Sequence, residues 1–304
     1  MKTALLCSGQ GSQYVGMMKD LAELRPGIAQ KLKRADEILG YGITKIAFEG
    51  PLETLKETRY TQPALFLHSA LIADELRGKT EFDGVAGHSV GEYAAIYAAG
   101  AISFEDALKL VSLRGELMFK AGENEPGTMF AVINLDDDKV EEVCKELTSR
   151  GEGVVVAANF NSPGQVVVSG SRDFLRANVG AFKEAGARMT KELVVSGAFH
   201  SPLMQPAKEE LERAIAATQF TEAKVPVYAN VTAAPLTQAE EIKNALIAQL
   251  TSPVRWTQSL RRMQADGFGK FIEIGAGSVL QGLVKRTLEG AEALGVDKAS
   301  ELPQ

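Results

Sequence analysis

Ser89 lies in a pattern that places a hydroxyl group at a sharp turn. The sequence GHSVG at residues 87–91 follows a short apolar run and precedes a helix-forming stretch, residues 92–99. Glycines on both sides of a serine permit a strained strand-to-helix turn that exposes the hydroxyl at the N-terminus of the helix. The same five letters also occur in ordinary turns, but the flanking strand and helix favour a nucleophile.

A serine hydroxyl is a weak nucleophile at neutral pH and needs a positioned base, usually a histidine. The sequence contains three histidines. His88 is held inside the turn, where we expect its side chain to point away from the serine, and His68 lies in an apolar helical run typical of a packed core. His200, on a loop, is the remaining candidate. The alternative for His200 is a loop histidine that only binds backbone.

No acidic residue lies in a segment typical of a third triad member. A main-chain carbonyl can take that role. Residues 238–250 predict a helix stopped by Ser252-Pro253. The last carbonyls of this helix, near Gln249, are unpaired acceptors at the negative end of the helix dipole, and they can hold an imidazole N–H.

An oxyanion formed at Ser89 needs hydrogen-bond donors. The backbone N–H of Val90, at the start of the helix after the turn, is one donor by construction. A second can come from the N–H of Gln10, because the glycines on either side of it leave the approach unobstructed. Without the serine turn beside it, this segment would be a plain glycine turn.

Arg114 stands out because of its neighbours. Residues 104–121, with Ser103 as N-cap, predict a helix with an apolar stripe, and Arg114 falls in the middle of that stripe. An unpaired buried arginine costs several kcal/mol, so this one needs an anion, either a structural carboxylate or a ligand. A serine nucleophile favours the ligand, because a planar guanidinium matches a carboxylate in a two-point contact.

Composition excludes several classes of protein. The 304 residues are 45% hydrophobic and 24% charged, with a net charge of −6, two cysteines and three histidines. This is an ordinary globular composition, without a disulfide framework, a metal-ligand spacing, a basic surface for nucleic acid or a membrane span. We expect a cytoplasmic protein without metal or cofactor, since the apolar run before Ser8 is too short for a signal peptide.

The order of the predicted elements indicates an α/β fold with an insert. Strands at 3–7 and 82–86 alternate with helices near 17–39, 63–77 and 92–99, with Pro63 taken as a first-turn proline. Residues 127–195 instead follow a β-α-β-β-α-β order, which is ferredoxin-like. The alternation resumes with helix 206–217, strand 225–229 and strand 270–274. We therefore predict an α/β-hydrolase-like domain with a parallel sheet, residues 1–126 and 196–304, carrying a ferredoxin-like insert, residues 127–195.

Two further glycine-containing segments are interpreted as turns. Gly275-Ala276-Gly277 begins like a dinucleotide-binding loop, but Leu280 occupies the place of the third glycine. We interpret it as a tight strand-to-helix turn. Residues 159–165 are typical of a hairpin bent at Pro163-Gly164, and the last dozen residues are expected to form a loose tail.

A series of segments in the same order resembles malonyl-CoA:acyl carrier protein transacylases of fatty-acid synthesis. Single segments are weak indicators, but together they span nearly the whole chain. They are GQGSQ at 9–13, TQPALF at 61–66, GHSVGEYAA at 87–95, Arg114, NFNSPGQVVVSG at 159–170, AFHSPLM at 198–204, QLTSPVRW at 249–256 and EIGAGSVLQGLVKR at 273–286. Ala276 replaces a proline that bacterial relatives often have there.

The resemblance implies a ping-pong transfer in which Ser89 takes malonyl from coenzyme A and passes it to the phosphopantetheine thiol of acyl carrier protein. The implied roles are His200 as base and then acid, the Gln249 carbonyl as its orienter, Arg114 as carboxylate clamp, the Gln10 and Val90 amides as oxyanion hole, and Asn159 in substrate binding. In relatives, a phenylalanine before the active histidine accompanies malonyl, so Phe199 points to malonyl rather than methylmalonyl.

Coenzyme A and the carrier protein are acidic, so a net-negative chain needs a local basic rim to receive them. We expect the rim among Lys183, Arg188, Lys191, Lys285 and Arg286, on a protein that acts as a monomer.

The rival functions are a serine hydrolase, such as a carboxylesterase or patatin-like lipase, and a non-catalytic module that binds carrier protein. Arg114 and a histidine far from the C-terminus argue against the hydrolase.

Overall fold

A computed structural model of the chain describes residues 1–303. Its larger sheet has six strands in the order β10-β9-β1-β2-β7-β8. Neighbouring strands are parallel except β7 and β8, which form an antiparallel pair at one edge. The strands are β1 (Lys2–Cys7), β2 (Gly84–Gly87), β7 (Val227–Tyr228), β8 (Pro235–Leu236), β9 (Phe268–Ile274) and β10 (Glu292–Val296). The predicted α/β class with a parallel sheet is confirmed.

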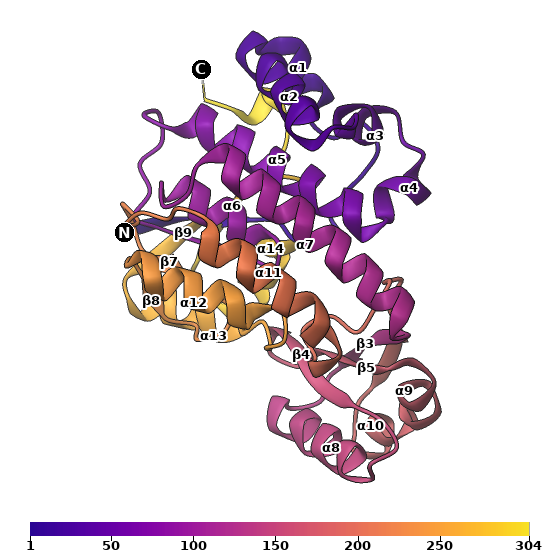
Figure 1. Cartoon of the computed structure of the whole chain (residues 1–304). Coiled ribbons are helices and arrows are strands. Elements are labelled where there is room, and N and C mark those ends of the chain that lie inside the picture. The colour runs from indigo at the N-terminus through magenta and orange to yellow at the C-terminus, as the bar shows by residue number, and fades with distance from the viewer. Residues whose placement is uncertain (304) are drawn as a thin grey trace.

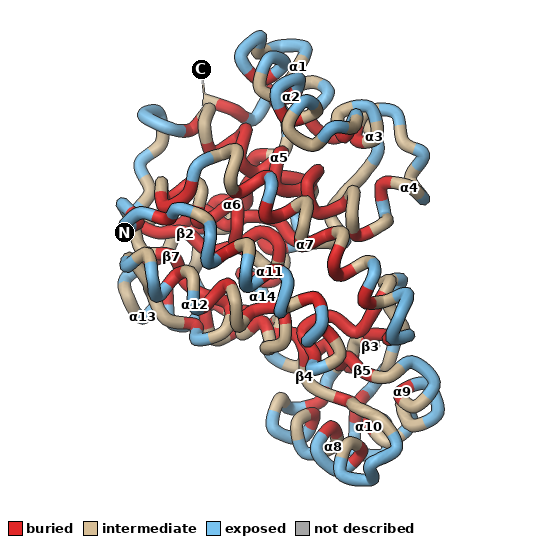
Figure 2. The backbone as a smooth tube through the Cα atoms, in the orientation of Figure 1, coloured by how far each residue is buried: buried red, intermediate tan, exposed pale blue. Residues whose placement is uncertain are grey.

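Helices cover this sheet and bury most of α5 at the centre of the larger lobe (Figure 2). Of the described residues, none belongs to a helix long and apolar enough to cross a bilayer. The helices are α1 (Lys19–Leu24), α2 (Pro26–Leu39), α3 (Ile43–Glu49), α4 (Leu52–Lys56), α5 (Thr58–Leu76), α6 (Gly91–Ala98), α7 (Phe104–Asn124), α11 (Gln205–Ala217), α12 (Ala239–Gln249), α13 (Trp256–Ala265) and α14 (Val279–Thr287), with 3-10 turns at Pro202–Met204 and Ala299–Glu301.

The insert forms a second, four-stranded antiparallel sheet in the order β4-β5-β3-β6. With its helices it makes the smaller lobe at the bottom of Figure 1. Its elements are β3 (Gly127–Ile133), α8 (Asp137–Ser149), β4 (Val155–Ser162), β5 (Gln165–Ser171), α9 (Arg172–Asn178), α10 (Gly180–Glu184) and β6 (Met189–Glu192). This is the predicted ferredoxin-like order. The exact domain boundaries stay a prediction, which the two separate sheets support.

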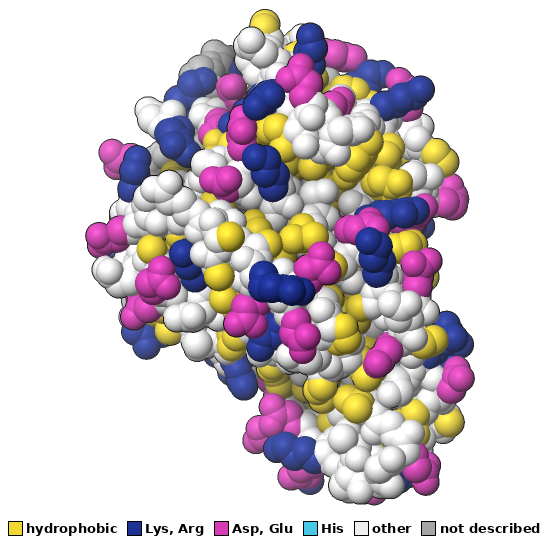
Figure 3. Space-filling view, in the orientation of Figure 1, with side chains coloured by type: hydrophobic (Ala, Val, Ile, Leu, Met, Phe, Trp, Pro, Cys, Tyr) yellow, Lys and Arg dark blue, Asp and Glu magenta, His cyan; other side chains and the backbone are white. Residues whose placement is uncertain are grey.

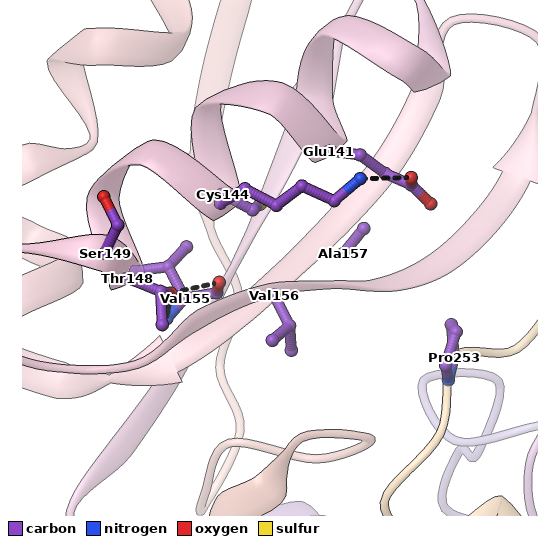
Figure 4. A pocket seen from close by; sticks show the side chains of 9 residues that line it. Glu141, Cys144, Thr148, Ser149, Val155, Val156, Ala157 and Pro253 are labelled. Carbon is purple, nitrogen blue, oxygen red and sulfur yellow. Dashed lines mark hydrogen bonds and ion pairs between the residues drawn. The ribbon is translucent and has the colours of Figure 1, made fainter.

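The lobes are joined along the edge strand β4. Val254, in the loop before α13, donates its N–H to Ala158 O at 2.8 Å and accepts from Phe160 N at 2.9 Å. Beside this joint, α8, β4 and Pro253 enclose a hollow of about 500 Å³ (Figure 4). The main-chain bonds fix β4, and with it Asn159, against the larger lobe.

Three predictions about elements were wrong. Helix α5 begins at Thr58, so Pro63 lies inside the helix rather than in its first turn. The C-terminal segment is not loose, because β10 pairs with β9 and Asp297 accepts a hydrogen bond from Tyr14 Oη at 2.8 Å. The second helix of the ferredoxin-like order predicted for residues 127–195 is two short helices, α9 and α10, with Val179 between them.

Candidate active site

Ser89 sits at the turn between β2 and α6 with φ +53°, a left-handed conformation that a non-glycine residue rarely adopts. A Cβ at Gly87 would lie 2.0 Å from Gly91 C, and one at Gly91 would lie 2.2 Å from Cys7 O. No side chain fits at either position. The two glycines therefore let the turn close tightly against β1, and this closure aims the Ser89 hydroxyl outward.

His200 lies directly against this hydroxyl. Its Nε2 is 2.8 Å from Ser89 Oγ, and its Nδ1 is 3.0 Å from Gln249 O and 3.2 Å from Ser252 O. Carbonyl oxygens only accept hydrogen bonds, so Nδ1 carries the proton and Nε2 is left as the acceptor that faces the serine. The histidine loop and the end of α12 thus meet at the turn.

The imidazole is buried, and burial lowers the pKa of His200 to about 3, with the nearby Arg114 charge adding to the shift. A pKa that low keeps the ring neutral at neutral pH, so Nε2 is free to take the Ser89 proton. The imidazolium that forms is held by the two carbonyls. The neutral ring is the form that a general base needs, because only a free Nε2 can accept a proton.

Arg114 is only 1% exposed and lies beside the serine. Its Nη2 donates to Ser89 Oγ at 3.1 Å and to Gln249 Oε1 at 3.0 Å, and its Nη1 donates to Gln62 Oε1 at 2.7 Å. All three partners are uncharged. Among residues 1–303, its Nε has no partner at all. Burial lowers the pKa of Arg114, and the negative charge of the nearby Glu92 carboxylate offsets part of that shift. No carboxylate hydrogen-bonds the guanidinium directly, so its Nη2 and Nε can still receive the carboxylate of a ligand.

A cavity of about 150 Å³ opens in front of the serine. Ser89, His200 and Gln10 line its polar side, and Asn159 reaches it from the insert. The remaining wall is largely apolar, and Phe199 forms part of it. Both lobes therefore contribute to the space in which an acyl group would sit.

Of the two predicted oxyanion donors, Gln10 lines this cavity, and Val90 directly follows Ser89 in the chain. Val90 is the N-cap of α6, and the Gln10 loop approaches so closely that a Cβ on Gly9 would lie 2.6 Å from His88 O. The Gln10 side chain is tied down by Thr58, whose Oγ1 accepts from Gln10 Nε2 at 3.2 Å. Ser89 N is unavailable as a donor, because it bonds Asn230 Oδ1 at 2.8 Å.

The two other histidines lie outside this chemistry. His88 turns its Nε2 to Asn161 Oδ1 at 2.8 Å, away from Ser89 Oγ, and packs against Trp256. His68 is fully buried in α5, with its Nε2 2.8 Å from Asp297 O. Both agree with the structural interpretation made from the sequence.

Three polar residues around the site were missed. Gln62 accepts a hydrogen bond from Arg114, and Asn230 accepts one from the Ser89 N–H. Glu92 accepts the N–H of Asn230 and is 1% exposed, and burial raises its pKa to about 7. The Gln249 side chain was missed as well, since only its carbonyl was considered. A usable signal existed for Gln62 and Glu92, because each is a polar residue in an apolar helical run, as Arg114 is.

The loop that carries His200 packs against two glycines, Gly122 and Gly127. A Cβ at Gly122, near the end of α7, would lie 1.8 Å from Ser196 O, and one at Gly127 would lie 2.3 Å from Ala198 N. Residues 196–198 therefore pack directly against the backbone of Gly122 and Gly127, where no side chain stands between the two segments. This contact sets where the chain enters the His200 turn, whose φ is +57°.

We expect Gly122→Ala to lower the free energy of unfolding by about 2 kcal/mol, although alanine normally gains up to about 1 kcal/mol over glycine in a helix. The Ser196 carbonyl must move, so acylation of Ser89 should also slow. Chemical denaturation measures the first effect. Gly282→Ala in α14 is the matched control, because its Cβ would meet nothing closer than Arg286 Nη2 at 3.8 Å. If Gly122→Ala and Gly282→Ala were stabilised equally, the close contact between Gly122 and the Ser196 carbonyl could not be important for stability.

A parallel sheet with a serine at a strand-to-helix turn and a histidine on its hydroxyl defines the class of serine-dependent acyl-transfer enzymes and hydrolases. Within that class, residues 4–303 match the family described as acyl transferase domain, and the chain belongs to this family. This confirms the resemblance found in the sequence motifs.

Individual relatives agree with this assignment. The chain is 41% identical to the malonyl CoA-acyl carrier protein transacylase of Haemophilus influenzae, over 97% of this chain and 95% of the relative. It is 42% identical to the Bacillus subtilis protein of the same name, over 94% and 90%. An acyl carrier protein S-malonyltransferase from Vibrio cholerae superposes with a TM-score of 0.94 at 41% identity, covering 99% of both chains.

A further solved structure contains a partner. A malonyl-transacylase in complex with its type II PKS acyl-carrier protein superposes with a TM-score of 0.94 at 38% identity, covering 99% of this chain and 98% of the other.

Proposed function

We propose that this chain transfers malonyl from malonyl-CoA to the phosphopantetheine thiol of acyl carrier protein, through an ester on Ser89, in fatty-acid synthesis. The observation that carries the proposal is the buried Arg114 guanidinium, 3.1 Å from Ser89 Oγ and bonded only to uncharged side chains. A buried guanidinium that no carboxylate contacts directly fits an acyl group that brings its own carboxylate. An ordinary esterase substrate offers none.

The reaction proceeds in two symmetrical halves. His200 Nε2 takes the Ser89 proton while Oγ attacks the thioester carbonyl, and the Val90 and Gln10 N–H groups stabilise the oxyanion. Collapse expels the coenzyme A thiolate, which takes the proton from the imidazolium. In the second half, His200 removes the proton of the phosphopantetheine thiol, whose sulfur attacks the malonyl ester and releases Ser89 Oγ, which is reprotonated. The chemistry uses side chains, main chain and two substrates, and calls for no further cofactor.

The cavity supports transfer over hydrolysis. Its apolar wall includes Met118, Met129 and Phe199, and its volume of about 150 Å³ suits a small acyl group. Such a wall holds the ester in a poorly hydrated space, where a long thiol arm reaches the carbonyl more readily than water does. Phe199 in that wall supports malonyl over a branched acyl group, because the ring occupies the room that an α-methyl group would need.

A second opening supports the basic rim. A cavity of about 130 Å³ shares Gln10, His88 and Asn161 with the acyl cavity, and Arg286 is also among the residues that line it. All five predicted rim residues are exposed. On the face seen in Figure 3, basic and acidic side chains are interspersed. A docking site for an acidic carrier protein at the cavity mouth therefore relies on local rather than overall charge.

Charge reversal of Lys285 and Arg286 is expected to slow transfer to carrier protein by about tenfold or more, since complementary charge raises association rates. Transfer to free pantetheine should stay unchanged, because this acceptor has no carrier protein attached that could contact the rim. Steady-state rates with the two acceptors measure the difference. Lys79→Glu, another exposed lysine, is the control. Unchanged rates with both acceptors would remove these two residues from the rim.

Intact-mass spectrometry tests the function itself. After exposure to malonyl-CoA, the protein should gain one malonyl group that persists until a pantetheine thiol is added, while acetyl-CoA and methylmalonyl-CoA should label it less. Rapid release of malonate without an acceptor would favour the serine hydrolase. A cytoplasmic monomer without a nucleic-acid or membrane partner stays a prediction from the sequence.

A further inference from the structure

Glu92 is a buried carboxylate directly behind the nucleophile. It lies on the first turn of α6, one helical turn after Ser89, and is 1% exposed. Its Oε1 accepts the N–H of Asn230 at 3.2 Å, and its Oε2 accepts a hydrogen bond from Gln249 Nε2. The described mechanism makes no use of it.

The Gln249 side chain connects this carboxylate to Arg114. Gln249 Nε2 donates to Glu92 and, at 3.0 Å, to Ser89 O, while Oε1 accepts from Arg114 Nη2 at 3.0 Å. A flip of the amide would bring its oxygen against a carboxylate and its NH₂ against a guanidinium. Since a carboxylate only accepts and a guanidinium only donates, one orientation satisfies every contact.

The orientation of Gln249 in turn affects where Arg114 points. Nη2 is shared between Gln249 Oε1 and Ser89 Oγ, and Nη1 is held by Gln62 Oε1. Two amide oxygens thus clamp the guanidinium beside the hydroxyl. If one of them turned its NH₂ toward Arg114, the guanidinium would lose an acceptor and be pushed away from the serine.

We propose that Glu92 is a positioning residue for acyl selectivity, which fixes the Gln249 amide with its oxygen toward Arg114 and so keeps the guanidinium aimed at the acyl carboxylate. The inference rests on the proposed function, because it assumes that Arg114 receives malonyl. The competing explanation is that Glu92 only ties α6 to the segments that carry Asn230 and Gln249. That purely structural role would affect all acyl groups alike.

Glu92→Gln separates these explanations. The new side chain must present its oxygen to the Asn230 N–H, so its NH₂ faces Gln249, and the Gln249 amide has to flip. We expect the ratio of kcat/KM for malonyl-CoA over acetyl-CoA to fall about tenfold or more, the size of a lost hydrogen bond to a charged group. The assay is run at pH 8, above the pKa of Glu92, with thermal unfolding measured alongside. An unchanged ratio in the folded variant would overturn the proposal.

Gln249→Met provides a second test that does not depend on whether Glu92→Gln folds. It removes the amide but keeps the main-chain carbonyl that holds His200, so the same selectivity loss is expected with Glu92 intact. In the double variant, Glu92→Gln should add nothing further, because there is no amide left to turn. A normal ratio in Gln249→Met, or additive losses in the double variant, would exclude action through Gln249.

Glu273→Gln is the matched control, because Glu273 is also 1% exposed and accepts backbone N–H groups, from Leu280 and Gln281. It should leave the selectivity ratio unchanged. The wild-type protein separates the two hypotheses. If it shows no preference for malonyl-CoA, the proposed function fails, whereas if it shows the preference and both variants retain it, only the role of Glu92 fails.

Discussion

Ser89→Ala is expected to abolish the covalent intermediate and to reduce malonyl transfer by at least about 10⁴-fold, because no other group can carry the acyl ester. Ser89 Oγ lies 2.8 Å from His200 Nε2 and 3.1 Å from Arg114 Nη2, so the hydroxyl contacts both the proposed base and the proposed carboxylate clamp. Alanine removes one oxygen without changing the turn. Intact-mass spectrometry after exposure to malonyl-CoA should find no added mass.

The fold should survive this substitution. The Ser89 N–H keeps its bond to Asn230 Oδ1, and the glycine contacts of the turn are unaffected. Ser149→Ala, on the exposed end of α8, is the control and should behave as wild type. Full transfer activity in Ser89→Ala would revive the alternative of a carrier-protein-binding module whose serine is not used.

Arg114→Ala is expected to lower kcat/KM for malonyl-CoA by about 10²–10⁴-fold while acetyl transfer is retained or improved. Losing one partner of a buried charge pair costs about 3–5 kcal/mol, which is the origin of that range. An acetyl group has no carboxylate to pair, so it loses no contact when Arg114 is removed. The two kcat/KM values, measured on the same preparation, give the selectivity directly.

The control for this variant lies on the same helix. Lys109→Ala removes a cation from the exposed face of α7 and should leave both rates unchanged. Equal loss with malonyl-CoA and acetyl-CoA in Arg114→Ala would mean that the arginine supports the fold or the serine itself. That result would remove the main observation behind malonyl specificity.

Much of the candidate site was predictable because its signals are local. The turn at Ser89 needs small residues within one strand-to-helix connection, and these appear as the GHSVG pattern. Arg114 was identified by helical periodicity alone, and it is buried as its place in the stripe required. His200 followed from the small number of histidines, and the end of α12 near Gln249 from the proline that follows it.

The errors came from segments whose structure depends on distant partners. Pro63 is tolerated inside α5, although propensity places a proline at a helix start, because α5 is packed on several sides by other helices. The strand β10 contains an exposed leucine and a glycine, and its pairing with β9 determines its conformation. Neither effect is visible within a short window of sequence.

The sequence by itself determined the α/β class and the ferredoxin-like insert and singled out Ser89, His200 and Arg114 as candidates for nucleophile, base and buried cation. It could do so because periodicity, glycine spacing and residue type act over a few positions along the chain. Only the tertiary structure decided how these groups face one another. It showed that Arg114 has uncharged partners and that Glu92, Gln249 and Asn230 surround the turn. Hydrogen-bond direction at a buried site depends on atoms brought together from the turn after β7, from α6 and from α12, whose separation in sequence hides their contact.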